Sequence, residues 1–342
     1  MITQSREVGM KFVTFAANRP GRPVLRAGVL GDGVVVDIDH AIAARGGEPL
    51  AGSSSDGGSE LLTLIRAGDP AIEIARAATE HVVAAGDEHN GDEVIIHPAG
   101  DVQLVSPLPR PNSLRDYLVV EEHLRNCVAA GLIDSIADEW YNIPAHYKGN
   151  VDEIYGPDDT VPWPAYTDKL DYELEICAVI GTPGRRISAE DAGRHILGYT
   201  LYNDWSARDL QAREMSVGTG PGICKDFGSS IGPCIVTPDE FDRDNAHLEA
   251  RIDGEVWSSG VLGAMHFSFE EIIEWTSQEE TLRPGDLLGS GTVGRGCGAE
   301  MDRWITEGCV VELEAEGIGV LRNRVGRKGA GPTRIIDVDA LR

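Results

Sequence analysis

The stretch LDYELEICAVIG, from Leu170 to Gly181, constrains the fold of this chain more than any other segment. Its residues alternate in the period-two pattern of a β-strand, whose side chains point to opposite faces. One face carries Tyr172, Leu174, Ile176 and Ala178, and the other carries Asp171, Glu173, Glu175 and Cys177. Glutamate is disfavoured in strands and like charges on one face repel. The acidic face therefore needs a compensating partner.

Two interpretations account for the acidic face. Carboxylates at positions i and i+2 point the same way and can hold one hard cation, such as Mg²⁺, Mn²⁺ or Ca²⁺. A solvated strand face with salt-bridge partners is the alternative. The strand alone leaves both interpretations open.

The bulk composition excludes several classes of partner. The 342 residues carry a formal charge of −26, from 30 basic and 56 acidic residues, which argues against nucleic acid and anionic membranes. No apolar run is long enough to span a bilayer, and the N-terminal segment has no signal-peptide core. The six cysteines lack zinc-ligand spacing, so we expect reduced, buried thiols in a cytoplasmic protein.

The first part of the chain, residues 1–109, is predicted to be a small α+β module. MKFVTFAA, PVLRAGVLG and GVVVDIDHAIAA are typical of short strands, and Gly52 to Glu60 is typical of a loop ending in a helix cap. LLTLIRAG and PAIEIARAATEHVVAAG have helical periodicity. A proline-rich connector places the boundary near Arg110.

Residues 110–342 are predicted to form a larger, mainly β domain. Many glycine-punctuated strands and few helices favour a mixed, mostly antiparallel sheet over a doubly wound one. RDYLVVEEHLRNCVAAG predicts a helix, AYTDKLDYELEICAVIG one long strand or two, and SAEDAGRHILGYTLYNDWS a capped helix followed by a strand.

Further candidate functional residues lie near the ends of the predicted elements. Asp204 ends an apolar strand, where it can supply a third oxygen ligand or cap the next helix. Arg208 is expected to pair with Asp209, or alternatively to reach a substrate carboxylate. Gln211 faces either a ligand or solvent. Lys225 is either a surface lysine or a partner of a substrate carboxylate or enolate.

Two segments add candidate acid–base groups. Asp116 and His123 are seven residues apart, two turns of the expected helix, so they share a face. His123 suits a general base near neutral pH, or alternatively a structural role. GSGTVGRGCGAEMDRW is a glycine-rich loop that can bring Thr292 and Glu300 toward the site, or is an ordinary turn.

These signals together resemble one family. RDYLVVEEHLRN, LDYELEICAVIG, GYTLYNDWSARDLQAREM, KDFGSSIGPCIVTPDE, GDLLGSGTVG and VELEAEGIGVLRNRV occur in the order found in the fumarylacetoacetate hydrolase family, over roughly residues 105 to 328. The resemblance implies an α+β, mainly β fold, a mixed β-sandwich roll with a small N-terminal module, usually assembled as a homodimer.

The resemblance also implies roles for individual residues. Glu173, Glu175, Asp204 and Asp116 match the ligands of Mg²⁺, or of Mn²⁺ or Ca²⁺. His123 matches the water-activating base, with Glu300 as its candidate partner, and Lys225 matches the active-site lysine. The substrate-contacting positions fall on Tyr147 in PAHYKGN, Gln211 and Thr292.

The function predicted from the sequence is metal-dependent hydrolysis of a C–C bond in a β-diketone or acylpyruvate, in the catabolism of aromatic or cyclic compounds. Decarboxylation of a β-keto acid, tautomerisation and enol hydration on the same metal site are the alternatives within the fold. A non-catalytic protein that binds a cation such as Ca²⁺ for stability is the alternative from another class.

Overall fold

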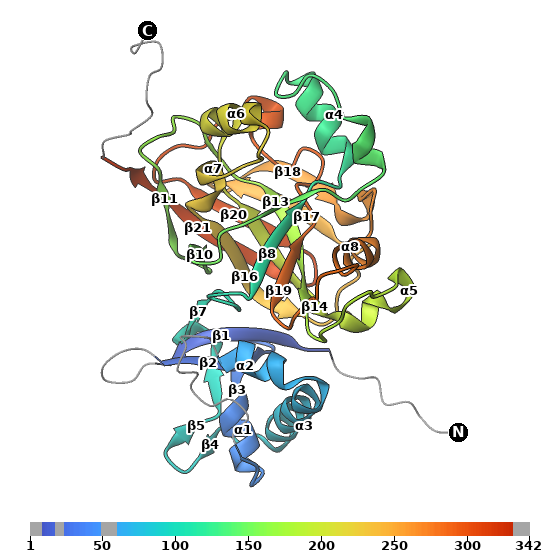
Figure 1. The fold of residues 1–342 in the computed structure, drawn as a ribbon. Helices are drawn as coiled ribbons and strands as arrows, with labels where there is room; N and C mark the ends of the chain where they lie inside the picture. The colour runs from blue at the N-terminus through green and yellow to red at the C-terminus, as the bar shows by residue number, and fades with distance from the viewer. Residues whose placement is uncertain (1–8, 18–23, 49–59, 331–342) are drawn as a thin grey trace.

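The computed structural model describes residues 9–17, 24–48 and 60–330. A twelve-stranded sheet dominates the fold (Figure 1). In order along its path, its strands are β6 (Ile96–Pro98), β3 (Val34–Asp37), β2 (Val24–Leu30), β1 (Lys11–Ala17), β16 (Ser229–Val236), β14 (Ile196–Asp204), β13 (Leu174–Ile180), β19 (Asp286–Gly289), β8 (Ser113–Tyr117) and β9 (His146–Lys148). Two further strands, β7 (Gln103–Val105) and β10 (Ile154–Tyr155), pair with β1 and β16.

The large sheet is mixed, as the sequence predicts. β8 runs parallel to β19, and β10 runs parallel to β16. The pairs at the centre, β13 with β14 and β14 with β16, are antiparallel. This arrangement brings the ends of strands that are distant in sequence to one edge of the sheet.

A second, five-stranded sheet covers one face of the large sheet. Its strands, in spatial order, are β11 (Thr160–Trp163), β21 (Gly319–Lys328), β20 (Val310–Ala315), β17 (His247–Ile252) and β18 (Glu255–Val261). Ile176 and Leu201 of the large sheet share one hydrophobic core with Leu248 and Leu313 of the second. Two short ribbons pair β12 (Leu170–Asp171) with β15 (Ser206–Ala207), and β4 (His89–Asn90) with β5 (Glu93–Val94).

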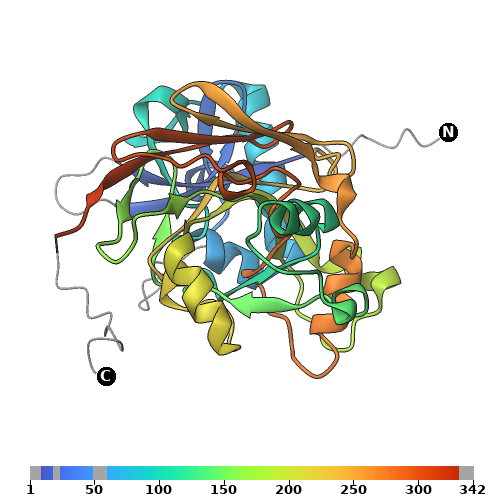
Figure 2. The same ribbon diagram turned by 90° about the horizontal axis from the view of Figure 1, so that it is seen from above.

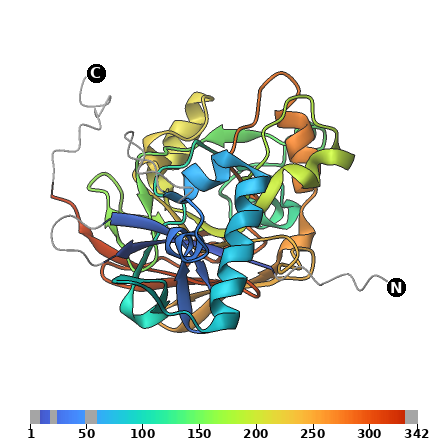
Figure 3. The same cartoon turned by 90° about the horizontal axis from the view of Figure 1, so that it is seen from below.

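Helices of the N-terminal region cover the opposite face. These are α1 (Ile38–Ala44), α2 (Glu60–Ala67) and α3 (Asp69–Ala85), which lie in front of the strands in the view from below (Figure 3). Leu62 and Ile65 of α2 share a second core with Cys177 and Val179 of β13. Because the large sheet is buried on both faces, every residue of β13 is buried.

The remaining helices lie around the second part of the chain. α4 (Glu121–Ala129) and α6 (Arg208–Val217) lie at the end of the molecule that faces the viewer in Figure 2. The short helix α7 (Ile223–Asp226) contacts α6, and α5 (Ala189–Ala192) contacts α8 (Phe269–Thr276). Within the described ranges, no helix is both long and apolar enough to cross a membrane.

The large sheet takes strands from both sides of the predicted boundary at residue 110. Phe12 of β1 pairs with Ile235 of β16, so the N-terminal strands extend the sheet that carries β13 and β14. The division into residues 1–109 and 110–342 stays a prediction.

The structure corrects two predicted elements. The helix expected over RDYLVVEEHLRNCVAAG begins only at Glu121, and Asp116 lies in β8, because pairing with β19 outweighs helical propensity there. The strand expected over GVVVDIDHAIAA ends at Asp37, whose side chain accepts a hydrogen bond from the His40 backbone N–H and so caps α1. The predicted loop at 52–59 lies outside the described residues. All six cysteines are free and buried, as predicted.

Candidate active site

Three acids from three strands converge inside the large sheet. Asp116 lies on β8, Glu175 on β13 and Asp204 at the end of β14. One carboxylate oxygen from each lies within 4.8 Å of the other two, and all three side chains are buried. We refer to these residues as the carboxylate trio. Strand pairing, rather than closeness in sequence, brings them together.

The ion pair between Lys225 and Asp204 compensates the negative charge of the trio only in part. Asp116 Oδ1, Glu175 Oε2 and Asp204 Oδ1 are buried without a hydrogen-bond partner among the described residues. Burial and then the Asp204 charge raise the pKa of Asp116 to about 7. Burial and then the Asp116 charge raise the pKa of Glu175 well above its usual range. Burial also raises the pKa of Asp204, although Lys225 opposes it.

These features fit a hard divalent cation. Buried carboxylate oxygens with free lone pairs, and no sulfur or nitrogen ligand among them, suit Mg²⁺, Mn²⁺ or Ca²⁺. Thr292 Oγ1 donates to Glu175 Oε1 at 3.1 Å and so fixes that carboxylate. A Cβ atom on Gly289 would lie 2.6 Å from Asp116 Oδ1, so a larger residue there would displace this carboxylate oxygen.

Charged side chains of alternating sign form a largely buried row that ends at the trio. In order, they are Asp171, Arg208, Glu173, Lys225 and Asp204, and we call them the ionic chain. Arg208 donates from Nε to Asp171 and from Nη2 to Glu173, each at 2.8 Å. Lys225 Nζ donates to both Glu173 and Asp204. Each ionic contact offsets part of the cost of burying its charges.

Glu173 occupies a different position from the other predicted ligands. Arg208 holds its Oε1 and Lys225 holds its Oε2. Burial would raise the pKa of Glu173, but the charges of Lys225 and Arg208 outweigh it and lower that pKa. The structure thus brings three of the four predicted ligands together and places Glu173 beside them, joined through Lys225. Its role as a ligand stays a prediction.

His123 and Glu300 form a buried pair. His123 Nδ1 lies 2.8 Å from Glu300 Oε1, and Glu300 Oε2 accepts from Asn126 Nδ2 at 2.7 Å and from the Arg295 backbone N–H at 2.8 Å. Burial alone would lower the pKa of His123, but its contacts with Cys127, Cys297 and Glu300 outweigh burial and raise that pKa well above 6.5. The Glu300 carboxylate beside Nδ1 thus favours the protonated form of the His123 ring.

The pair lies next to the ionic chain. Cys297 forms an isolated β-bridge with Glu173, and its thiol donates to Glu300 Oε1 at 3.5 Å. The charge of His123 also contributes to the lowered pKa of Glu173. The acid–base pair and the carboxylate trio therefore flank Glu173 and Lys225, so proton transfer and cation binding can serve one reacting molecule.

The four predicted substrate-contacting residues all bond to site residues. Tyr147 OH donates to Asp204 Oδ2 at 2.7 Å, and Gln211 Oε1 accepts from Arg208 Nη1 at 3.0 Å. Thr292 bonds to Glu175, as described above. Substrate contacts by Tyr147, Gln211, Arg208 and Thr292 stay predictions.

Two alternative interpretations of this segment are wrong. Arg208 pairs with Asp171 and Glu173, not with Asp209, whose carboxylate accepts from Thr167 Oγ1 and the Asp168 backbone N–H. Adjacent helical residues point in directions about 100° apart, which separates these two side chains. Asp204 is not a helix cap, because it lies in β14 and α6 follows Ala207 without a side-chain cap bond.

Sequence reasoning missed Asn126, Cys297 and Tyr202. Asn126 follows His123 by three residues, and this spacing puts both on one helical face toward Glu300. Tyr202 precedes Asp204 by two residues on β14, and its hydroxyl lies 3.4 Å from that of Tyr147. The available sequence signals were the position of Asn126 three residues after His123 and that of Tyr202 two residues before Asp204.

Several known proteins are similar to this chain. A sequence model of the family described as Fumarylacetoacetate (FAA) hydrolase C-terminal matches residues 114–326. The human mitochondrial oxaloacetate tautomerase FAHD2A is 32% identical over 67% of this chain and 71% of its own length. The oxaloacetate tautomerase YisK of Bacillus subtilis is 30% identical over 78% of this chain and 86% of its own. The fumarylacetoacetate hydrolase structure from Exiguobacterium antarcticum matches with a TM-score of 0.68 and is 26% identical. The match covers 93% of this chain and 100% of the Exiguobacterium chain.

Removing one charge from the trio should stabilise the metal-free protein and weaken cation binding. We expect Glu175→Gln to raise the free energy of unfolding without metal, because like-charge repulsion falls. Wild-type protein should gain about 3 kcal/mol from Mn²⁺ at roughly one hundred times its Kd, and the variant should gain almost none. Urea unfolding with and without Mn²⁺ measures both, with Asp244→Asn at an exposed acid as the control. An equal gain in Glu175→Gln would contradict the site.

The protonation of His123 should depend on Glu300. Because the folded-state pKa is raised, the pair stabilises the protein fully below pH 6.5 and loses this contribution as the pH rises through the folded-state pKa. Glu300→Gln removes the negative partner, so the imidazole should titrate at lower pH. NMR titration of the ring Cε1–H, assigned with His123→Gln, measures the shift. An unchanged or higher pKa in Glu300→Gln would refute the pairing.

Proposed function

The chain belongs to the fumarylacetoacetate hydrolase family, and from this premise we propose that it is a divalent-metal-dependent enzyme that transfers protons on a 2-oxo acid. Keto–enol tautomerisation of an oxaloacetate-like substrate is the proposed reaction. The observation that carries this proposal is the buried His123–Glu300 ion pair beside the carboxylate trio.

A bound cation would be held by Asp116, Glu175 and Asp204, with Glu173 as the fourth candidate. As a Lewis acid, it would polarise neighbouring substrate oxygens and lower the cost of negative charge on them. Orphaned oxygens on all three trio members support this assignment. Mn²⁺ and Mg²⁺ are both consistent with such a donor set.

The chain's own residues supply the proton transfer. Tautomerisation of an enol to a ketone adds a proton at carbon and releases one from the hydroxyl oxygen. The His123 imidazolium is the proposed donor to carbon, with Glu300 holding its Nδ1 side and so fixing the ring. The hydroxyl proton leaves to solvent, from which His123 is reprotonated. The Lys225 ammonium stabilises negative charge that develops on the oxygen.

Proton donation by His123 is favoured over water activation by its contact with the Glu300 carboxylate. The contacts with Cys127, Cys297 and Glu300 raise the pKa of His123, which favours the protonated form that an acid needs. The human and Bacillus subtilis relatives described above, 32% and 30% identical, are named as oxaloacetate tautomerases. Both facts support tautomerisation ahead of the hydrolysis predicted from the sequence.

Hydrolysis of a C–C bond in an acylpyruvate is the second candidate. The match with a fumarylacetoacetate hydrolase over the whole of that chain favours it. The same His123, once deprotonated, can take a proton from water with Glu300 orienting it. A role in aromatic catabolism, a cytoplasmic location and a homodimeric assembly stay proposals.

Product analysis tests the proposal. With Mn²⁺ and oxaloacetate in D₂O, we expect faster loss of enol absorbance and faster deuterium exchange at C3 than without protein, with no added pyruvate. His123→Gln should slow both by about 10²-fold or more, whereas His247→Gln, at an exposed histidine, should not. Added pyruvate and carbon dioxide would indicate decarboxylation.

An acylpyruvate panel separates the second candidate. Release of pyruvate and a carboxylic acid, with no effect on the oxaloacetate enol, would replace tautomerisation by hydrolysis. No turnover of either class, together with retained Mn²⁺ binding, would contradict the enzymatic proposal and support a non-catalytic metal-binding protein.

A further inference from the structure

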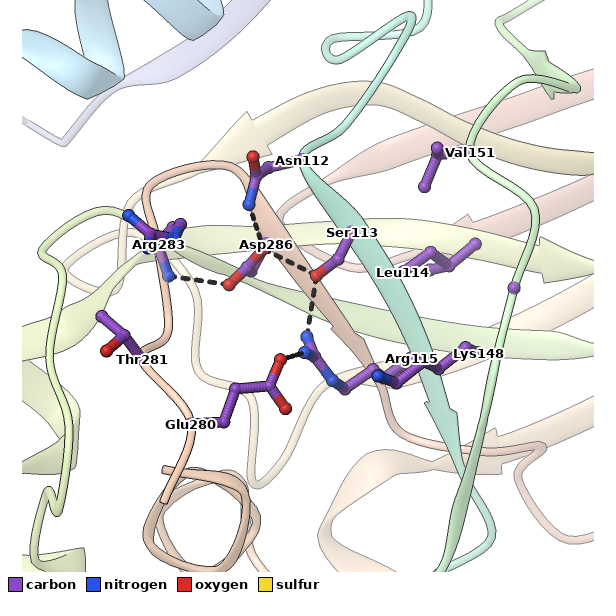
Figure 4. A pocket seen from close by; sticks show the side chains of 11 residues that line it. Asn112, Ser113, Leu114, Arg115, Lys148, Val151, Glu280, Thr281, Arg283 and Asp286 are labelled. Atoms are coloured by element: carbon purple, nitrogen blue, oxygen red, sulfur yellow. Dashed lines mark hydrogen bonds and ion pairs between the residues drawn. The ribbon is translucent and has the colours of Figure 1, made fainter. Parts of the chain in front are cut away.

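A pocket of about 380 Å³ opens behind β8 and β9, on the side away from the carboxylate trio. Its lining includes Ser113 and Arg115 of β8, Lys148 of β9, and Glu280 and Arg283 of the segment before β19 (Figure 4). The volume is at the lower end of the range found for small-molecule sites.

The pocket lining carries three cationic side chains and two acids, in a chain of net charge −26. Arg115 pairs with Glu280 and also donates to Ser113 Oγ at 2.7 Å. Lys148 and Arg283 are exposed, and their side chains form no ion pair or hydrogen bond with the residues that the structure describes. Two cations are thus left without an anion at one opening.

The floor of the pocket holds an unsatisfied donor. Arg115 is only 3% exposed, yet its Nε lacks a hydrogen-bond partner among the described residues. The second acid of the lining, Asp286, is already satisfied, because its oxygens accept from Asn112 Nδ2, Ser113 Oγ and the Arg283 backbone N–H. A buried guanidinium donor without a partner is costly, and an anionic oxygen is its natural acceptor.

We propose that this pocket binds a small dianion, a dicarboxylate or a phosphorylated metabolite. The free Nε–H of Arg115 donates to one anionic group, and the exposed Lys148 and Arg283 pair with the other charge. Guanidinium groups match the planar oxygens of carboxylate and phosphoryl groups.

The same two strands connect this pocket to the candidate active site. In the register of β8 and β9, Arg115 pairs with Lys148 and Asp116 pairs with Tyr147. Side chains alternate along a strand, so the first pair faces the pocket and the second faces the trio. A dianion that reorients Arg115 and Lys148 acts on the backbone that positions Asp116, and on Tyr147, which bonds to Asp204. Dianion and cation binding are therefore coupled, whatever reaction the trio supports.

Calorimetry on the full chain tests the binding. EDTA keeps the trio free of cations, so succinate and inorganic phosphate cannot bind through an active-site metal. We expect one dianion per chain at physiological ionic strength, and a Kd raised roughly tenfold or more in Lys148→Gln/Arg283→Gln, where two charge-assisted contacts are lost. Both substitutions are at exposed positions, which protects folding. Arg45→Gln, an exposed arginine after α1, is the matched control.

The outcomes separate the two ligand classes and the coupling. Binding of succinate alone identifies a dicarboxylate site, and binding of phosphate alone identifies a phosphoryl site. No heat with either probe, or equal binding in the double variant, would overturn the proposal. Coupling predicts that saturating succinate changes the Kd for Mn²⁺ in wild-type protein but not in the double variant. An unchanged Kd would refute the coupling and leave the pocket as a binding site only.

Discussion

Carboxylates buried together without enough positive charge are the constraint on which the rest of this structure depends. The acids involved are Asp116, Asp171, Glu173, Glu175 and Asp204, and the cations among them are Arg208 and Lys225. The ionic chain compensates one end of this group, whereas the trio keeps three orphaned oxygens. Burying unpaired charge in a protein interior is costly, so the site requires either protonation or a divalent cation.

Hydration would be a simpler way to stabilise these negative charges, but the fold buries the acids. A second sheet covers one face of the large sheet, and α2 covers the other, so Glu175 on β13 is fully buried. The packing that stabilises the fold therefore also keeps like charges buried close together. A bound cation would couple stability to the proposed function, because it would neutralise the buried acids and also polarise substrate oxygens.

The sequence predicts the faces of the central strand but not the partners of each acid. Alternation in LDYELEICAVIG separates the two faces correctly, since Ile176 and Cys177 belong to different cores. Local periodicity failed where long-range pairing decides, as at Asp116, which lies on a strand paired with β19. Glu173 and Arg208 are 35 residues apart, so their contact has no local signal. The geometry of Glu300 likewise depends on how its loop folds over α4.

The central claim is that Asp116, Glu175 and Asp204 share one divalent cation. Anomalous scattering at the manganese edge, from crystals soaked in Mn²⁺, tests it most directly. The account predicts one strong peak per chain within about 2.3 Å of an oxygen from each of the three carboxylates. A peak only at exposed acids, or well-ordered crystals without a peak among the three carboxylates, would contradict the account.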